Sequence, residues 1–272
     1  MKTNIHFRFL PIHVPLRAAI GLFLSTVWCG PASTGTPTLE PGGDATVIEI
    51  VDGDTLRLAD GQQVRLVGLQ APKLPLGRPN FKAWPLGDEA KAALAELTLH
   101  KRIQLSYGGR KSDRYGRLLA HLHDSGGVWI QGEMLRRGLA RVYSFPDNRH
   151  LVGPMLAAER EARIAGRGIW GHEFYRIRQA ERLEGDNGTF QLIEGRVRDV
   201  ATVRGRTYLN FGADWRKDFT IAVSPRDRRR FEKATIGLTK LKGRLVRVRG
   251  WLIWRNGPMI EATHPEQLEV LE

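Results

Sequence analysis

The first part of the chain alternates between short apolar segments and polar turns. Three segments of four to six residues are rich in apolar and branched side chains, which favours β-strands at 46–51, 55–58 and 64–69. Asp60-Gly61 lies between the second and third segments and is typical of a hairpin turn. The segment 70–86 follows with four prolines, so it is expected to be an irregular loop.

Apolar residues at helical spacing begin after this loop. Ala90, Ala93, Leu94 and Leu97 share one face of a predicted helix at about 87–99. Two further helices are predicted at 128–137, before the typical C-cap Gly138, and at about 152–165. Strands are predicted between the first two helices, at 103–107 and 117–123. Together these elements predict a first domain over 45–171.

The last part of the chain has a different pattern of short alternating segments. Residues 172–189 are charged and contain Gly and Asn, so they are expected to form a linker. Strands are then predicted at 192–198, 207–211, 219–223, 245–254 and 259–262, with the hairpin signal Asn256-Gly257 before the last. Five strands in about 80 residues predict a small OB-like β-barrel over 190–272.

The N-terminus has the layout of a secretory signal. Basic residues precede an apolar run at 18–28, and small and turn-forming residues follow it. The run is shorter than the ~20 apolar residues of a membrane span. We therefore expect a signal peptide at 1–33 and export to the periplasm or the extracellular space, with an uncleaved membrane anchor as the alternative. The segment 34–44, rich in Pro, Gly and Thr, is expected to be a flexible spacer.

The overall charge favours polyanionic partners. The formal net charge is +13, which suits nucleic acid, anionic lipid headgroups or an acidic cell-wall polymer. A soluble protein that is basic without such a partner is the alternative. The single cysteine, Cys29, excludes an intramolecular disulfide.

Polar residues interrupt the first strands at positions that suit chemistry. Asp52 and Asp54 stand at the entrance of the second strand, and Arg65 lies within the apolar run of the third. Paired carboxylates beside a guanidinium can bind a metal and a phosphate together. The alternative is that the two aspartates only cap a turn.

Four motifs occur in order: VDGDT at 51–55, VRLVGL at 64–69 followed by Ala71-Pro72, GDEA at 87–90 and DRYGR at 113–117. On these motifs the chain resembles the staphylococcal-nuclease-like (thermonuclease) family over about 45–171. The resemblance implies an α+β, mainly β fold, with an OB-type five-stranded barrel and three helices. It also implies an endonuclease that hydrolyses phosphodiesters of DNA and RNA with Ca²⁺.

The resemblance assigns roles to single residues. Arg65 and Arg117 match the family's phosphate-binding arginines, where each guanidinium can donate two parallel hydrogen bonds. Asp54 matches a metal ligand, and Asp52 and Asp113 match supporting carboxylates. Without the resemblance, Arg117 would be interpreted as a surface residue.

Two positions depart from the family pattern. Gln70 stands where the family has an acidic second metal ligand, and Lys73 stands where it has the glutamate assigned as general base. A protonated lysine brings positive charge toward the metal and cannot act as a base at neutral pH. Loss of a general base costs ~10²–10⁴-fold in rate.

Three functions therefore remain open. In the first, hydrolysis persists with another metal or another base, such as Asp52, Asp113 or a carboxylate from 87–90. In the second, the site binds phosphate through Arg65, Lys73 and Arg117 with little turnover. In the third, the domain is a scaffold for protein or envelope contacts.

The second barrel carries candidate nucleic-acid-binding residues. Arg244, Arg247 and Arg249 alternate with apolar residues along one predicted strand, and Trp251 and Trp254 follow. Barrels that bind single strands combine a basic groove with stacking aromatics. The alternative places the tryptophans in the core and the arginines on a solvated face. A further arginine cluster at 226–230 is expected in a loop.

Overall fold

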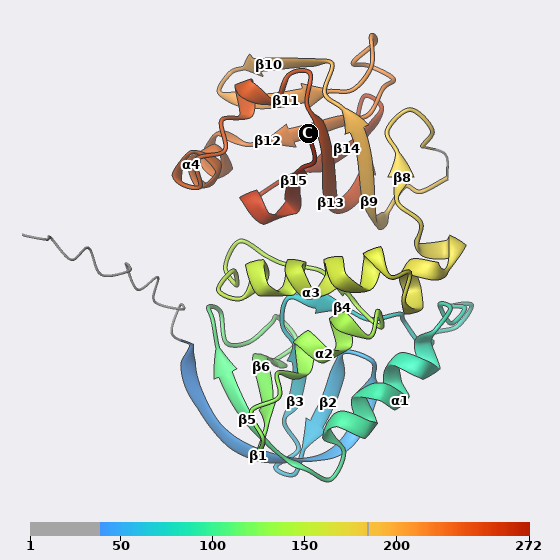
Figure 1. Ribbon diagram of the computed structural model, residues 1–272, viewed down its shortest axis with the longest axis vertical. Coiled ribbons are helices and arrows are strands. Elements are labelled where there is room, and N and C mark those ends of the chain that lie inside the picture. Colours follow the sequence, from blue (N-terminus) through green and yellow to red (C-terminus); the bar gives the residue numbers. More distant parts are fainter. Residues whose placement is uncertain (1–38, 184) are drawn as a thin grey trace, which may run out of the picture. The chain divides into compact units, whose positions relative to one another are not determined.

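The computed structural model describes residues 39–183 and 185–272 (Figure 1). The predicted signal peptide at 1–33 and the first part of the predicted spacer lie outside the described residues. Among the described residues, no helix is long and apolar enough to cross a membrane.

The first barrel confirms the predicted OB-type architecture. Its strands are β1 (Glu40–Asp52), β2 (Thr55–Leu58), β3 (Gln63–Leu66), β5 (Arg102–Tyr107) and β6 (Leu118–Asp124). They close in the order β1-β2-β3-β6-β5, and β3 and β6 are the parallel pair. The interior is filled by the alternate apolar residues of these strands, including Leu56, Val64 and Leu122. The strand β1 begins at Glu40, so residues 40–44 of the predicted spacer belong to the sheet.

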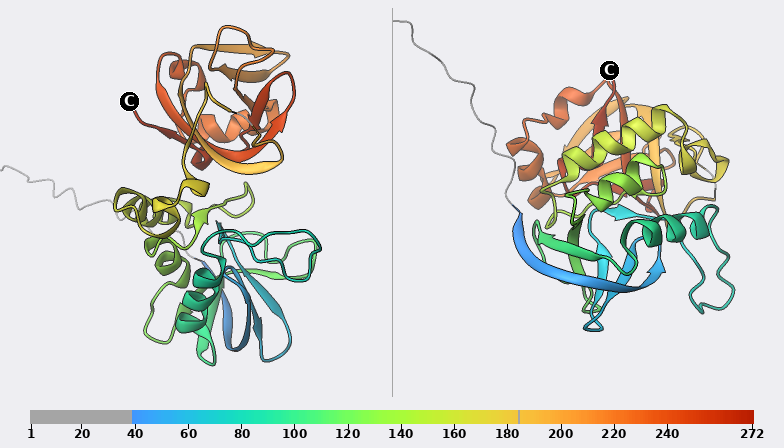
Figure 2. Two further views of the ribbon diagram at one scale, coloured as in Figure 1. Left: turned by 90° about the vertical axis from the view of Figure 1, so that its right-hand side faces the viewer. Right: turned by 60° about the horizontal axis from the view of Figure 1, so that its bottom comes forward.

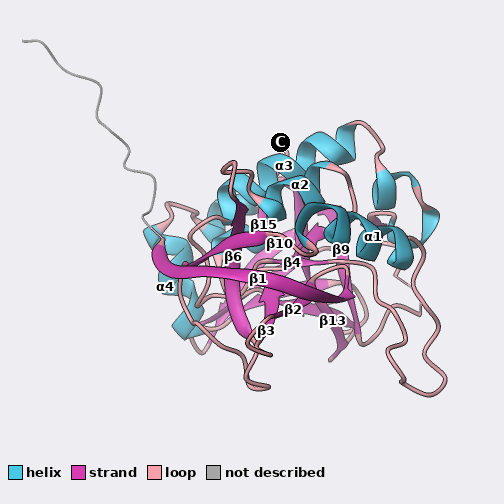
Figure 3. Ribbon diagram, turned by 90° about the horizontal axis from the view of Figure 1, so that it is seen from below, coloured by secondary structure: helices cyan, strands magenta, loops and turns pink. Residues whose placement is uncertain are grey.

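Three helices accompany this barrel at the predicted places: α1 (Gly87–Thr98), α2 (Ile130–Arg136) and α3 (Val152–Ile164). Helix α1 packs against β1, and α2 packs against α3 and β6 (Figures 1 and 3). Ala90 and Leu94 form part of the buried face of α1, as their spacing predicts. The proline-rich loop between β4 and α1 extends away from the barrel (Figure 2).

The predicted third strand is divided by a turn at Gly68. This glycine has φ +84°, and a side chain there would meet the Met155 sulfur of α3 at 2.6 Å. The chain therefore leaves the barrel after β3 and forms β4 (Leu69–Gln70), which pairs with β7 (Arg141–Val142). Because of this turn, Gln70 does not continue the strand of Arg65 and instead pairs with Arg141.

The second module repeats the strand order of the first. Its strands are β9 (Thr189–Arg196), β10 (Asp199–Val203), β11 (Arg206–Asn210), β12 (Thr220–Val223), β13 (Leu245–Trp254) and β14 (Pro258–Glu261). They pair in the order β10-β11-β12-β14-β13-β9. Only Val197 and Arg198 separate β9 from β10, and their amides donate to the carbonyls of Arg244, directly before β13, and of Asn210 on β11. The two strands are thus halves of one bent strand, and the sheet returns on itself.

The parallel pair and the helix also correspond between the modules. β12 and β14 are parallel, as β3 and β6 are, and a helix follows the third strand in both. In the second module this helix is α4 (Pro225–Lys233), which contains the arginines expected in a loop. Ser224 caps it by accepting the amide of Asp227. This order supports the predicted OB-like barrel.

Short strands extend the second sheet beyond the prediction. β15 (Leu268–Val270) pairs with β13, and β8 (Arg178–Gln179) pairs with β9. The strand β8 and the 3₁₀ turn at Glu173–Tyr175 lie in the segment predicted as a linker.

Candidate functional site

Asp54 lies at the centre of the polar cluster and is fully buried. The turn before it requires Gly53, because a side chain there would come within 2.8 Å of Ala71 and Ala90. Its Oδ1 accepts from Arg65 (3.0 Å) and from the Thr55 hydroxyl (3.1 Å). Its Oδ2 accepts from Lys73 Nζ (2.6 Å) and from the Ala71 amide (2.9 Å). Both carboxylate oxygens are therefore fully used.

The charges around Asp54 fix its ionisation. Burial raises the pKa of its carboxyl, but the charges of Arg65 and Lys73 lower it by more. The net result is a pKa well below the usual range, so Asp54 is a carboxylate at neutral pH. The two cations are thus held by a permanent negative charge.

The ammonium of Lys73 lies between two carboxylates. Its Nζ is 2.6 Å from Asp54 Oδ2 and 3.5 Å from Asp52 Oδ2. Burial and the nearby Asp54 charge raise the pKa of Asp52, although Lys73 opposes them. The other Asp52 oxygen accepts the Asp54 amide at 3.1 Å. An amino-acid side chain therefore supplies the positive charge for this carboxylate pair.

Gln70 is directed away from Asp54. Its Oε1 accepts from Arg141 Nε (3.2 Å) and Nη2 (2.9 Å). Arg141 is buried, which lowers the pKa of its guanidinium to about 10, and it lies 4.8 Å from the Phe190 ring centre. The amide oxygen expected as a metal ligand thus serves a buried arginine.

This donor set does not fit a calcium ion. Calcium takes six to eight oxygen ligands, whereas the oxygens of Asp54 and Gln70 already accept hydrogen bonds from cationic side chains. Within residues 39–183 and 185–272, no group of three His, Cys, Asp or Glu side chains could hold a metal. The Asp54 and Gln70 oxygens are therefore not available as a calcium site.

The two predicted phosphate-binding arginines come from neighbouring strands. Arg65 lies on β3 opposite Leu119 of β6, and Arg117 directly precedes β6 on the same face. Both line a cavity of about 460 Å³, which we call the Arg65 hollow. The structure thus brings Arg65 and Arg117 together in one cavity, and their role in phosphate binding stays a prediction.

Asp113 holds Arg117 in place. Its Oδ2 lies 2.6 Å from Arg117 Nη2 and 2.8 Å from Nε, and its Oδ1 accepts the amides of Tyr115 and Arg117. Burial raises the pKa of Asp113, but these hydrogen bonds outweigh it, so the pKa is lowered. Gly116 supplies the φ of +78° that the turn requires. Asp113 therefore positions Arg117, and its supporting role at a phosphate stays a prediction.

The sequence interpretation missed several residues of the Arg65 hollow. Arg110 and Arg114 add positive charge, and Tyr143 and Phe145 line it as well. Tyr115 is exposed, with the guanidiniums of Arg114 and Arg117 at 4.8 and 5.5 Å from its ring centre. Cations beside aromatic rings suit phosphates and bases of a nucleic acid. Arg114 and Tyr115 lie within the DRYGR motif, whereas no local pattern singled out the others.

The second barrel supports one wall of this hollow. Trp251 donates to the Tyr143 hydroxyl at 2.8 Å, and Ser144 Oγ lies 2.7 Å from His264 Nε2. Arg149 binds both Glu266 oxygens. The segment that carries Tyr143 is therefore bound by residues of β13 and of the turn before β15.

His264 makes this support sensitive to acid. Burial, helped by Arg149 and Arg230 and opposed by Glu266 and Asp227, lowers its pKa to about 4. The unfolded value is ~6.5, so the unfolded chain binds the proton more tightly. We expect the contribution of His264 to the free energy of unfolding to be complete above pH 6.5 and to be lost as the pH drops toward 4. Denaturant titrations across this range measure it.

A variant isolates the contribution of His264. His121 is also buried, with a pKa lowered to about 3, and contributes in the same direction. In His264→Asn the loss of stability between pH 6.5 and 4 should therefore be smaller but still present. An unchanged pH dependence in this variant would contradict the assignment to His264.

The arginines predicted to bind nucleic acid in the second barrel have other partners. Arg249 is 1% exposed and binds Glu159 of α3 (2.9 Å) and Glu269 (2.6 Å). Arg247 is mostly buried and paired with Glu194 and Glu269. The predicted role does not hold for these two residues, because a buried and neutralised guanidinium cannot reach a phosphate.

The remaining candidates on this strand are accessible. Arg244 is exposed and bonds to the backbone carbonyl of Glu272. Trp251 and Trp254 are 46% and 58% exposed, so neither belongs to the core. The structure does not gather these three with Arg65 and Arg117 in one hollow.

Comparisons with known proteins agree with this geometry. The family model described as staphylococcal nuclease homologue matches residues 63–172. The chain is 31% identical over 137 residues to the SPbeta prophage-derived endonuclease YokF and to the endonuclease YncB, both of Bacillus subtilis. These matches cover 48% of this chain, and 45% and 64% of the two relatives, so the chain spans less than two thirds of either.

A third relative is matched over more of its length. It is an uncharacterized endonuclease of Escherichia coli, 32% identical over 127 residues, which are 46% of this chain and 74% of the relative. The matched region contains β3 and β6, which carry or adjoin Arg65 and Arg117, and the helices α1, α2 and α3. The chain belongs to the staphylococcal nuclease family.

Proposed function

We propose that this protein binds nucleic acid in the Arg65 hollow and hydrolyses its phosphodiester bonds without a calcium ion. The observation that carries the proposal is the position of Lys73 Nζ between Asp52 and Asp54. Family membership and the relatives named as endonucleases support a phosphodiester substrate.

The arginines bind and polarise the phosphate. Arg117 is fixed by Asp113 and Arg65 by Asp54, so both guanidiniums are oriented before the substrate arrives. Preorganised donors of this kind stabilise the charge that develops in the transition state. Lys73 balances the carboxylates behind Arg65, so that Arg65 is not drawn away from the phosphate by two uncompensated negative charges.

The proton acceptor differs from the family pattern. The carboxylates of Asp52, Asp54 and Asp113 each contact a cation. Asp147 is exposed and lines the Arg65 hollow, so we assign it the proton from the attacking water. The expected turnover is slow, because no base is held rigidly beside Arg65 and Lys73.

The alternative is a catalytically impaired protein that binds nucleic acid or another polyanion. The pairing of Asp52, Asp54 and Asp113 with cations favours it, because it removes the strongest candidate bases. Use as a scaffold without polyanion binding has no comparable support from the Arg65 hollow.

Cleavage of single-stranded DNA and RNA in different ions separates these functions. We expect the full chain to cleave at the same rate in calcium, magnesium, manganese or chelator. Asp147→Asn should lower the rate ~10²-fold or more, the range for loss of a general base, with binding unchanged. Cleavage that appears only with a metal would contradict the role of Lys73. Salt-sensitive binding without cleavage would leave the binding function alone.

We further propose that the protein is exported. The support is the sequence layout of residues 1–33, which resembles a secretory signal. Fractionation of cells that express residues 1–44 fused to a reporter enzyme tests this, and a reporter found entirely in the cytoplasm would contradict it.

A further inference from the structure

A second cavity lies on the outer face of the second barrel. It has a volume of about 610 Å³, larger than the Arg65 hollow, and we call it the Tyr208 hollow. Strand β11 provides its floor through alternate residues Arg206, Tyr208 and Asn210. The intervening Thr207 and Leu209 are buried on the opposite face. The floor is therefore a polar and aromatic strand face over a closed core.

Two loops complete the Tyr208 hollow. Trp215, 51% exposed, comes from the loop between β11 and β12, and the Arg216 guanidinium lies 4.5 Å from its ring centre. Arg255 and Asn256 come from the tight turn between β13 and β14. The hollow thus combines two aromatic rings with Arg206 and Arg255, and Arg216 lies beside it against the Trp215 ring.

The two loops are packed on each other. Gly257 has φ +86°, and a side chain there would lie 2.8 Å from the backbone of Lys217 and 2.9 Å from that of Asp218. Asp218 in turn accepts the amide of Asp214 at 2.7 Å. Trp215 is therefore carried on a loop that is braced before any ligand binds, which lowers the entropy cost of binding.

The polar groups of the hollow are mostly hydrogen-bond donors. Thr220 donates to Asn210 Oδ1 at 3.3 Å, which leaves the Asn210 amino group to donate. Asp199, the acid among the lining residues, is bound by Lys242 at 2.8 Å. Glu261 pairs closely with Arg206 and lies 3.9 Å from Arg255, whose side chain is 67% exposed, and Arg216 is exposed to solvent. This donor-rich lining suits an anionic ligand with flat rings.

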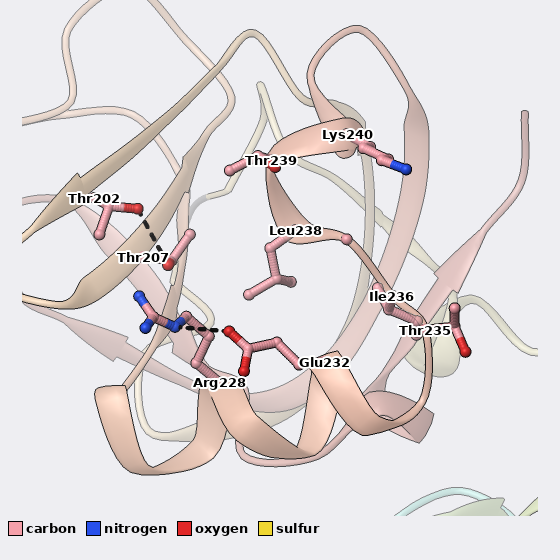
Figure 4. A pocket seen from close by; sticks show the side chains of 10 residues that line it. Thr202, Thr207, Arg228, Glu232, Thr235, Ile236, Leu238, Thr239 and Lys240 are labelled. Carbon is pink, nitrogen blue, oxygen red and sulfur yellow. Dashed lines mark hydrogen bonds and ion pairs between the residues drawn. The ribbon is translucent and has the colours of Figure 1, made fainter.

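A third cavity offers a contrast. It has a volume of about 420 Å³ and lies between the β10–β11 hairpin and α4. Figure 4 shows Arg228 turned toward Glu232 and the Thr202 hydroxyl turned toward Thr207. None of its ten lining residues is aromatic. Its one arginine is paired with Glu232 and it offers no aromatic ring, so it lacks the stacking surface of the Tyr208 hollow.

We propose that the Tyr208 hollow binds single-stranded nucleic acid. Bases stack on Trp215 and Tyr208, Asn210 and Asn256 meet base edges, and Arg216 and Arg255 meet phosphates. OB barrels bind oligonucleotides on the face of their second and third strands and at the loop between the fourth and fifth, which here are β11, β12 and the β13–β14 turn, and stacking tolerates any base sequence. This extends the proposed function, because it gives the same class of polymer a second contact, yet it does not require cleavage.

Binding of a labelled oligothymidylate to the full chain tests the proposal. The probe is about 20 nucleotides long, longer than the site of one OB fold, and chelator is present so that binding is compared without added metal. We expect the dissociation constant to rise tenfold or more in Tyr208→Ala/Trp215→Ala, as follows from losing two stacked bases. The single variant Trp215→Phe, which keeps an aromatic ring at this position, should retain most of the affinity of the unaltered chain.

Matched controls make the result specific. Phe174 is similarly exposed, at 45%, but lines neither hollow, so Phe174→Ala should bind like the unaltered chain. Circular dichroism and the unfolding midpoint verify that the variants fold. Unchanged affinity of the folded Tyr208→Ala/Trp215→Ala variant would overturn the proposal, as would an equal loss in Phe174→Ala.

The outcome is separate from that of the proposed hydrolysis. Loss of cleavage in Arg65→Ala/Arg117→Ala with Trp215-dependent binding retained supports both sites. Absence of cleavage under all conditions, with Trp215-dependent binding, overturns the hydrolysis alone. Cleavage together with an affinity that does not change in Tyr208→Ala/Trp215→Ala overturns the second site alone.

Discussion

Glu159→Gln is expected to lower the free energy of unfolding by about 3 kcal/mol, the lower end of the cost of breaking a buried ion pair. Glu159 is fully buried on α3, and its two oxygens bind Arg249 at 2.9 Å each. It also accepts the Val142 amide and an Arg163 N–H. The variant keeps the volume of the side chain but leaves Arg249 with Glu269 as its carboxylate partner. Denaturant unfolding at neutral pH measures the loss.

A paired replacement separates charge from packing. In Glu159→Met/Arg249→Met both charges are removed together, so the loss should be much smaller than in Glu159→Gln. A Glu159→Gln variant as stable as the unaltered chain would show that the network does not hold α3 against β13.

Arg117→Ala is expected to lower the rate of phosphodiester cleavage by ~10²–10³-fold, the range for removal of one preorganised donor. It should also reduce the salt dependence of nucleic-acid binding by ~1 phosphate contact. The physical reason is that Asp113 holds Arg117 beside Arg65 in one hollow. Initial rates and binding isotherms at several salt concentrations measure both effects.

Two variants control this result. Arg117→Lys keeps the charge but loses the planar fork, so it should recover binding more than cleavage. Arg102 is a highly exposed arginine on β5, paired with Asp44 outside the Arg65 hollow, and Arg102→Ala should change neither quantity. Equal losses in Arg102→Ala and Arg117→Ala would indicate a general effect of charge.

Local patterns predicted most of the first barrel because its strands and helices are short and strongly periodic. The start of β1 was missed because Pro41 and Gly42 are typical of a spacer. Pairing with β5, where Glu40 lies opposite Tyr107 and Pro41 opposite Ser106, overrides that local preference. Such long-range pairing has no signature in the segment itself.

Helix α4 was missed for a different reason. Its nine residues include one buried side chain, Phe231, so no apolar periodicity marks it. The capping residues Ser224, Pro225 and Asp227 were the available local signal. In Arg247 and Arg249 the alternation was correctly predicted, but the sequence could not show that acidic residues of α3, β9 and β15 cover that face.

The candidate site was predicted in its residues more than in its contacts. The motifs indicated Asp54, Arg65 and Arg117, and the departures at Gln70 and Lys73 were visible in the sequence. The hydrogen bonds from Arg141 to Gln70 join residues 71 positions apart and required the structure. The 2.6 Å contact between Lys73 and Asp54 also required the structure. It shows that the lysine places its own positive charge against the carboxylate.

Calorimetric titration of the full chain with calcium tests most directly whether Lys73 takes the place of the metal. We predict no saturable binding up to millimolar calcium in the unaltered chain. The variant Gln70→Asp/Lys73→Glu, which restores the family's acidic residues, should bind calcium, and adding Asp54→Asn should abolish that binding. Saturable calcium binding by the unaltered chain that disappears in Asp54→Asn would contradict the replacement of the metal by Lys73.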